Sequence, residues 1–262
     1  MPVACPLPEI CFAALAQIVG IGCCRSLNPP RGGREIQALA RNDGFALEQD
    51  NATGRVTLLA DDLRQSMADR RGVSMAAYIH AIFGLIRQAG ARRVLMIGCG
   101  GGTLASMLRL SNVDVTVVDI DASSFAIARD YFHMPDDVAC YVADGYTFLK
   151  RHTARYDAIV LDAYDGDKVP AQFLEPAFYT LAKKRLARGG VFLANIVGDR
   201  AQMCGLLAAS WRTVRLLDST VRGRNAVAVA GNVHALKRPR LLLRPARQAA
   251  KIEAELKALR WD

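Results

Sequence analysis

The sequence predicts an α/β fold, in which a mostly parallel sheet has helices on both faces and is preceded by a small β-hairpin region. Three observations predict it. Apolar runs of strand length alternate with helical stretches from about residue 92 to residue 212. A glycine-rich turn at residues 98–102 joins the first run to a helix, and aspartates follow the carboxyl ends of three runs. Such alternation is typical of parallel sheets that are buried on both sides.

The predicted elements divide the chain into four parts. These are an N-terminal extension (1–44), a small β region (45–73), the α/β domain (74–235) and a basic C-terminal helix (236–262). A breaker, Asn28-Pro29-Pro30, lies in the extension, and a turn at 51–54 joins the two strands of a hairpin over 45–63. In the domain we expect helices over 74–89, 103–110, 121–132, 146–152, 172–187 and 200–211. We expect strands over 94–97, up to 119, 138–142, 156–162 and 191–196, then an antiparallel pair at 214–218 and 226–231.

Composition limits the classes of partner. The 262 residues are 52% hydrophobic, which suffices for a sizeable core, and the net charge is +9. From Val233 onward the sequence contains eight lysines and arginines but only three acids. Such a tail can contact nucleic acid or a membrane surface, but no interleaved aromatic pattern accompanies it, and a solvated amphipathic helix explains it more simply. We therefore expect neither a nucleic-acid nor a membrane partner.

Cysteine and histidine usage favours a reducing compartment. The seven cysteines form no C-x-x-C pair, and the four histidines show no metal-ligand spacing, so we expect neither a disulfide framework nor a metal site. The apolar stretch 8–24 has no lysine or arginine before it, unlike a signal peptide, and it is short for a membrane span. These observations predict a cytoplasmic protein.

The glycine-rich turn indicates the ligand class. Dinucleotide folds of the hydride-transfer kind use G-x-G-x-x-G, but here Thr103 occupies the place of the third glycine. The spacing Gly98-x-Gly100-x-Gly102 resembles the loop of proteins that bind S-adenosylmethionine or its relatives. The alternative is a tight strand-to-helix turn with no ligand.

Three acids, Asp119, Asp144 and Asp162, follow predicted strands at the sheet edge where α/β proteins bind ligands. Each could instead be a helix cap. We expect Asp119 to accept hydrogen bonds from ribose hydroxyls and Asp144 to accept one from an adenine amine. Asp162 would then lie nearest the reacting centre, with Asp165 and Asp167 close behind. Carboxylates there would favour a cationic sulfonium and a cationic amine, and one could accept the proton that the amine loses on attack.

The stretch from Val94 to about Val197 resembles the spermidine synthase (polyamine aminopropyltransferase) family. The most specific segments are YDAIVLDAYDG and FLEPAFYTLAKKRLARGGVFLANI, and a weaker match upstream runs from Gly54 to Ser66. The resemblance implies a Rossmann-like domain of the class I methyltransferase type behind a small β domain. It also implies aminopropyl transfer from decarboxylated S-adenosylmethionine to a diamine such as putrescine, giving spermidine and methylthioadenosine. The sulfonium compound would be a co-substrate, no cofactor would be permanently bound, and the protein would be a homodimer.

The resemblance also implies residue roles. Asp162 would be the proton acceptor, while Asp165 and Gln65 would bind the amine. The nucleoside would be bound by Gly98, Gly100, Gly102, Asp119, Asp144, Gly145 and Pro170.

Three departures from the family pattern keep other functions open. Gly101 stands where the family carries an aspartate for the aminopropyl amine, Ser74–Ala77 replaces a polar Y-H-E-M entry to a helix, and Gly166 replaces a proline. A site without the aspartate could accept the carboxylated donor, so a methyltransferase on the same scaffold is the first alternative. The second is a non-catalytic nucleoside-binding or interaction protein that uses its basic tail.

Overall fold

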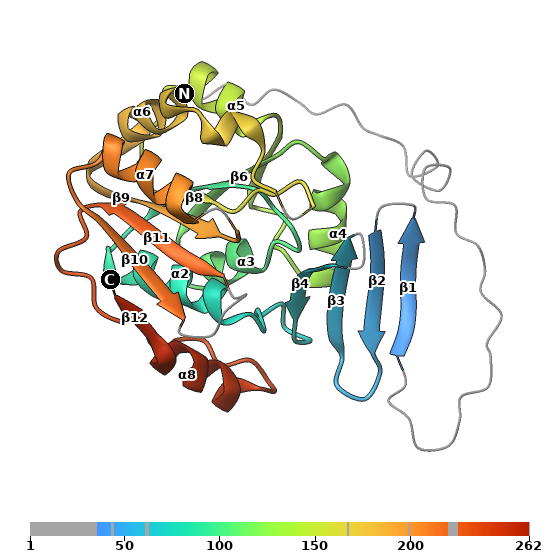
Figure 1. Ribbon diagram of the computed structural model, residues 1–262. Helices are drawn as coiled ribbons and strands as arrows, with labels where there is room; N and C mark the ends of the chain where they lie inside the picture. Colours follow the sequence, from blue (N-terminus) through green and yellow to red (C-terminus); the bar gives the residue numbers. More distant parts are fainter. Residues whose placement is uncertain are drawn as a thin grey trace.

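The computed structural model describes residues 36–42, 45–60, 63–166, 168–198, 200–219 and 225–261 (Figure 1). The expected N-terminal extension lies outside these residues up to position 35, together with the apolar stretch 8–24 and Asp167. The helices are α2 (Ala77–Gln88), α3 (Thr103–Arg109), α4 (Ala122–Phe132), α5 (Gly145–Arg151), α6 (Pro176–Arg185), α7 (Arg200–Ser210), α8 (Ala249–Ala258) and the 3-10 helix η1 (Ala171–Leu174). None of the helices in the described parts of the chain has the length and hydrophobicity needed to cross a bilayer.

Eight strands form a large mixed sheet in the order β12-β10-β11-β9-β8-β5-β6-β7. Its parallel part contains β5 (Arg93–Ile97), β6 (Asp114–Asp119), β7 (Ala139–Val142), β8 (Tyr156–Leu161) and β9 (Leu186–Ile196). The antiparallel strands are β10 (Val214–Ser219), β11 (Ala226–Gly231) and β12 (Leu259–Trp261). The chain leaves β5 toward β6 and later returns to β5's other side with β8, so the strand order reverses at β5. Open α/β sheets bind ligands at the carboxyl ends of the strands beside such a reversal.

Strand β5 shows why the large sheet needs helices on both faces. Val94 and Met96 belong to one buried apolar cluster, whereas Leu95 and Ile97 belong to the other, and each is at most 3% exposed. Alternate side chains of a strand point to opposite faces, so this apolar run requires cover on both sides. The predicted fold class, a mostly parallel Rossmann-like sheet of the methyltransferase type, is confirmed.

The small sheet, β1 to β4, is larger than the expected hairpin. The turn at 51–54 does join β2 (Phe45–Asp50) to β3 (Arg55–Ala60), but β1 (Ile36–Asn42) and β4 (Leu63–Ala68) pair on either side. A two-stranded hairpin is marginal alone, and the extra strands give a face large enough to bury apolar side chains. That face contributes Leu47, Val56, Leu58 and Ala68 to a cluster with Ile127 and Phe132 of α4.

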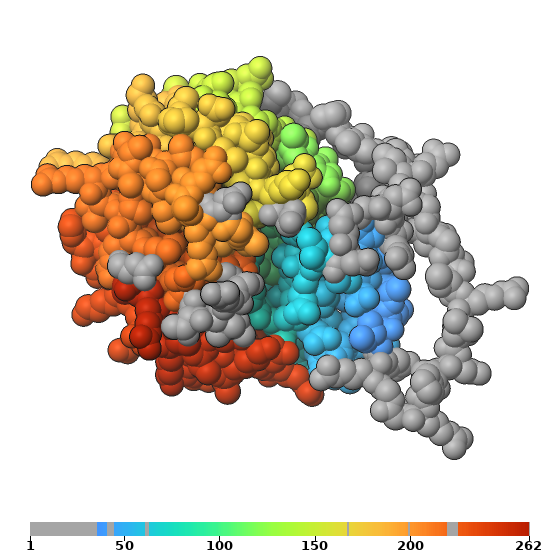
Figure 2. Space-filling view, viewed as in Figure 1, coloured from blue at the N-terminus to red at the C-terminus, as the bar shows by residue number. Residues whose placement is uncertain are grey.

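The C-terminal segment differs from the expected continuous helix over 236–262. Only Ala249–Ala258 is α-helical, and the next three residues form β12 at the edge of the large sheet. Pro239 and Pro245 lie in the stretch before α8, where a proline would remove a helical hydrogen bond. Figure 2 shows this segment (red) running along the lower edge of the molecule toward the small sheet (blue).

Asp69 holds these parts together at the end of β4. Its carboxylate is 4% exposed. It accepts hydrogen bonds from the backbone N–H groups of Arg71 (2.9 Å), Val73 (3.0 Å) and Ala246 (2.6 Å), and it forms an ion pair with the Arg71 guanidinium (3.1 Å). Burial by itself would raise the pKa of Asp69, but these hydrogen bonds outweigh it and lower the pKa.

We expect Asp69→Asn to destabilise the fold by about 2–3 kcal/mol at neutral pH, because charge-assisted hydrogen bonds to buried donors would be weakened. Chemical denaturation measures the difference, with the exposed Asp130→Asn on α4 as control. Since the folded state lowers this pKa, its contribution is present above the unfolded pKa near 4 and disappears as the pH falls below it. Equal stability of Asp69→Asn and the wild type at pH 7 would contradict this role.

Candidate active site

A cavity of about 1540 Å³ opens at the carboxyl ends of β5, β6 and β8, between the large sheet, the small sheet and α8. Its wall brings together nearly all the residues that the sequence singled out: Gln65, Gly98, Gly100, Asp119, Asp144, Gly145, Asp162, Asp165 and Pro170. Gly102 is the exception. It precedes α3 with φ of 64°, and a Cβ there would lie 2.8 Å from Ala128 and 2.9 Å from Met134 of the neighbouring segment. Gly102 thus serves the packing of the loop against α4 rather than the cavity surface.

Gly98 allows the glycine loop to touch the end of β8. A Cβ at Gly98 would lie 2.1 Å from the carbonyl oxygen of Asp162, and the φ of Gly98 is 99°. Only glycine tolerates this combination of close approach and positive φ. The Gly98 N–H donates to the carbonyl of Val118 (2.9 Å), which fixes the loop to β6 as well.

Gly101, where the family pattern has an aspartate, is closed off by other parts of the chain. A Cβ at Gly101 would lie 2.8 Å from the Cβ of Ser66 and 3.0 Å from the ring of Phe132, which is fully buried. The Gly101 N–H donates to the Ser66 hydroxyl (2.8 Å). Ser66 of the small sheet and Phe132 of α4 therefore occupy the space that a side chain at position 101 would need.

Asp119 lies beside the glycine loop at the end of β6. Its two carboxylate oxygens accept hydrogen bonds from the N–H groups of Cys99 (2.7 Å) and Asp121 (2.9 Å). Burial raises the pKa of Asp119 above its ordinary value. Burial, together with the charge of Asp119, also raises the pKa of the Cys99 thiol well above its usual range, so this thiol stays neutral.

Asp144 is a helix cap that also faces the cavity. One carboxylate oxygen accepts from the N–H of Thr147 (2.8 Å) at the start of α5, and the other accepts from the Gln172 amide (2.9 Å). Burial alone would raise its pKa, but these hydrogen bonds lower it overall. The neighbouring Gly145 packs closely on β5, since a Cβ there would lie 2.4 Å from Ile97. The cap and ligand interpretations of Asp144 are therefore compatible.

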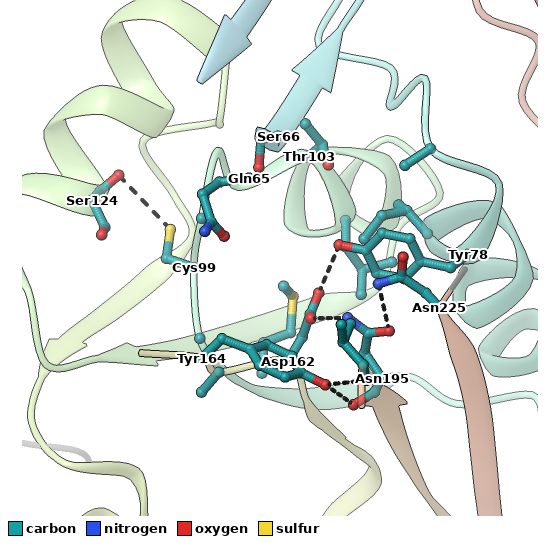
Figure 3. Close-up of a pocket in the computed structure, with 18 of the residues that line it drawn as sticks. Gln65, Ser66, Tyr78, Cys99, Thr103, Ser124, Asp162, Tyr164, Asn195 and Asn225 are labelled. Carbon is teal, nitrogen blue, oxygen red and sulfur yellow. Dashed lines mark hydrogen bonds between the residues drawn. The ribbon is translucent and has the colours of Figure 1, made fainter. Parts of the chain in front are cut away.

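Asp162, directly after β8, is the centre of a side-chain network (Figure 3). Its carboxylate accepts hydrogen bonds from the Tyr78 hydroxyl (3.3 Å) and the Asn195 amide (2.7 Å), and the Asn195 oxygen accepts from the Asn225 amide (2.9 Å). Burial raises the pKa of Asp162 to about 6, although both hydrogen bonds oppose that shift. Burial and the charge of Asp162 raise the pKa of Tyr78 well above its ordinary value, so the phenol keeps its proton. Asp162 is thus a carboxylate suited to take up a proton near neutral pH.

Asp165 lies on the exposed loop that follows. The backbones of Asp165 and Lys168 exchange hydrogen bonds of 2.9 and 3.1 Å across a tight turn, with Gly166 at φ of 59°. Pro170 follows at the start of η1. Asp165 and Pro170 both line the cavity.

Four polar residues of this site were missed from the sequence. Position 78 immediately follows the stretch expected to lack polar contacts, yet Tyr78 supplies the hydroxyl nearest Asp162. The Tyr164 hydroxyl donates to the Asn195 carbonyl (2.6 Å) and accepts from the N–H of Val197 (2.9 Å). Asn195 could have been found because it lies one residue before the end of β9, close to the carboxyl ends where the acids lie. Asn225 has no comparable local signal.

Comparison with known proteins shows which family the central part of the chain resembles. Residues 76–198 match the family model described as the spermine/spermidine synthase domain. Over 108 residues the chain is 32% identical to a probable polyamine aminopropyl transferase of Bifidobacterium longum, which covers 40% of this chain and 24% of that protein. Over 144 residues it is 28% identical to the polyamine aminopropyltransferase of Neisseria meningitidis, and the match covers 52% of this chain and 55% of that protein. Over 224 residues it is 27% identical to an N-terminal histidine N-methyltransferase of Emericella nidulans, and the match covers 71% of this chain and 40% of that protein.

The fold comparison agrees. The crystal structure of a probable spermidine synthase from Corynebacterium glutamicum superposes with a TM-score of 0.67 at 19% identity, covering 90% of this chain and 91% of the other. By contrast, the chain spans only a quarter to about half the length of the curated relatives it matches. Residues 76–198, just under half of the chain, thus resemble the spermine/spermidine synthase domain, and the fold agrees with that resemblance.

Proposed function

We propose that this protein is a transferase that moves an aminopropyl group from decarboxylated S-adenosylmethionine to a diamine such as putrescine, giving spermidine and methylthioadenosine. The observation that carries the proposal is the position of Asp162. Its carboxylate, with a pKa of about 6, lies in the same cavity as the glycine loop and Asp119. The names of the curated relatives point the same way.

In the proposed reaction, the amine nitrogen attacks the propyl carbon that is bonded to the sulfonium. A nitrogen–carbon bond forms, the carbon–sulfur bond breaks, and its electron pair goes to sulfur, which leaves as the neutral thioether. The amine loses one proton, which Asp162 accepts. Tyr78 and Asn195 hold the carboxylate in place through the hydrogen bonds of 3.3 and 2.7 Å.

The remaining residues divide between the two substrates. In this proposal Asp119 binds the ribose, Asp144 and Gly145 bind the adenine, and Pro170 lies on the loop beside the nucleoside. Gly98 and Gly100, which line the cavity, let the backbone approach the donor, while Gly102 packs the turn against α4. Asp165 and Gln65 bind the amine. A homodimer and a cytoplasmic location, both implied by the family, belong to the same proposal.

A donor-and-amine panel tests the proposal. Purified protein is incubated with decarboxylated S-adenosylmethionine and with diamines of increasing length, and products are identified by mass spectrometry. We expect methylthioadenosine together with an aminopropylated amine in equal amounts. Release of no methylthioadenosine with any diamine would overturn the proposal.

Methyl transfer is the second candidate. The similarity to the N-terminal histidine N-methyltransferase extends over 71% of this chain, further than either aminopropyltransferase match. The closed space at Gly101 also leaves no room for the aspartate that the family pattern places there. This candidate predicts S-adenosylhomocysteine and a methylated product from S-adenosylmethionine, which the same mass spectra would reveal.

A further inference from the structure

One part of the cavity wall differs in charge from the rest. The described acids that line the cavity come from the ends of β6 and β8, from the start of α5 and from α8: Asp119, Asp121, Asp144, Asp162, Asp165 and Glu255. The wall between β4 and the glycine loop contributes no described acid. It contributes Arg64, Gln65, Ser66 and Thr103 instead.

The donor's tail, which is the part of its propyl chain beyond the carbon that is attacked, would lie against this wall. In the proposed function the nucleoside lies against Asp119 and Asp144, and the attacking amine lies against Asp162. The part of the cavity that remains for the tail is the side formed by β4 and the glycine loop. Figure 3 shows Gln65, Ser66 and Thr103 together on that side, with Asp162 across from them. The Thr103 hydroxyl forms no hydrogen bond with another described residue, so it is available to a ligand there.

The chain itself prevents an acid from reaching this wall through position 101. Ser66 and Phe132 fill the space beside Gly101, at 2.8 and 3.0 Å from a hypothetical Cβ. A carboxylate there would attract a tail that ends in an ammonium group and repel one that also carries a carboxylate. No described residue places a carboxylate on this wall, so that repulsion is absent from the part of the wall that the structure describes. Arg64 of β4 contributes a cationic side chain to the same wall.

We propose that the site also takes S-adenosylmethionine itself and transfers its 3-amino-3-carboxypropyl group to the acceptor amine. This rests on the proposed function, because it requires the same attack on the propyl carbon bonded to sulfur. The nitrogen–carbon bond forms, the carbon–sulfur bond breaks with its electron pair going to sulfur, methylthioadenosine leaves, and Asp162 accepts the amine proton. The product differs from that of aminopropyl transfer by one carboxylate, which stays on the transferred group.

The test compares the two donors on the full-length protein with putrescine as the acceptor. We expect methylthioadenosine and a carboxylated adduct from S-adenosylmethionine, with kcat/KM within about tenfold of the value for the decarboxylated donor. The donor ratio is kcat/KM for S-adenosylmethionine divided by kcat/KM for its decarboxylated form. Arg64→Glu should lower this ratio by at least about tenfold, because the new carboxylate repels the carboxylate of S-adenosylmethionine. The ratio of the two dissociation constants from calorimetry should change in the same direction. Arg70→Glu, an exposed arginine outside the cavity wall, is the matched control and should leave both ratios unchanged.

The outcomes separate this inference from the proposed function. Methylthioadenosine from the decarboxylated donor alone would overturn the inference and leave the proposed function standing. Methylthioadenosine from neither donor would overturn both. S-adenosylhomocysteine with methylated amine would also overturn both, because the attack would then be on the methyl carbon. An unchanged donor ratio in Arg64→Glu would overturn the assignment of the tail to this wall.

Discussion

Asp162→Asn is expected to lower kcat by about 10²–10⁴-fold, the range that a positioned general base contributes, while methylthioadenosine still binds. Asparagine has nearly the same shape but cannot take the proton that the amine loses. Stopped assays of methylthioadenosine release measure the loss, and calorimetry measures nucleoside binding. Asp130→Asn, on the exposed side of α4, controls for removal of a carboxylate elsewhere. An Asp162→Asn enzyme with wild-type turnover would remove Asp162 from the mechanism.

The pKa of Asp162 gives this prediction a second readout. Burial raises it to about 6, so the carboxyl is protonated below that pH and cannot act as a base. The kcat/KM of the wild type should therefore rise as the pH increases through about 6. The residual kcat/KM of Asp162→Asn should not show this rise between pH 5 and pH 7. A wild-type profile that is flat between pH 5 and pH 7 would contradict the assignment.

The same shift predicts that Asp162→Asn is more stable than the wild type. A carboxyl whose pKa is raised from 3.8 to about 6 on folding costs free energy when it is ionised in the native state. At pH 7–8 the variant should therefore gain up to about 3 kcal/mol in free energy of unfolding. The gain should shrink as the pH falls through 6 and should vanish below about 4, where the carboxyl is protonated in both states. Together, lost activity and raised stability would indicate a functional residue rather than a structural one.

Gly98→Ala is expected to cost about 3–5 kcal/mol of stability, since it combines overpacking with an unfavourable positive φ. The new Cβ would lie 2.1 Å from the carbonyl oxygen of Asp162, so either the loop or the end of β8 must move. The variant should also lose nucleoside affinity, because Asp119 is bonded to the same loop through Cys99 (2.7 Å).

Gly205→Ala provides the matched control. Gly205 lies in α7, and a Cβ there would meet no atom within 4 Å. Alanine in a helix is favoured over glycine by about 0.5–1 kcal/mol, so this variant should be slightly more stable than the wild type. Thermal and chemical denaturation of both variants test the contrast. If Gly98→Ala were as stable as Gly205→Ala, the close approach of the glycine loop to β8 would be wrong.

Much of the cavity wall around the glycine loop could be predicted because its signals are local. The apolar run of β5, the turn beginning at Gly98 and the aspartate after β6 lie within 30 residues of one another. Strand period and turn chemistry act over such distances. Because the carboxyl ends of parallel strands lie at one edge of a sheet, the sequence alone predicts that Asp119, Asp144 and Asp162 lie at the same edge. The roles proposed for these aspartates are predictions that the mutants above can test.

The surroundings of Asp162 and Gly101 depend on contacts between distant segments. Tyr78 reaches Asp162 from 84 residues away, and Ser66 reaches the N–H of Gly101 from 35 residues away. The C-terminal segment was expected to form one basic helix, yet Ala246 bonds to Asp69 across 177 residues and β12 completes the large sheet. Propensity and periodicity carry no information about which distant element packs against which.

The sequence by itself determined the α/β architecture, the glycine loop and the edge of the sheet where the acids meet, because these follow from the period of apolar residues and from turn chemistry along a short stretch of chain. Only the tertiary structure decided what surrounds them. It brings Tyr78, Asn195 and Asn225 to Asp162, and it places Ser66 and Phe132 in the space beside Gly101. The physical reason is that burial and steric exclusion act between side chains that meet only after the helices have packed on the large sheet and the small sheet has packed on α4.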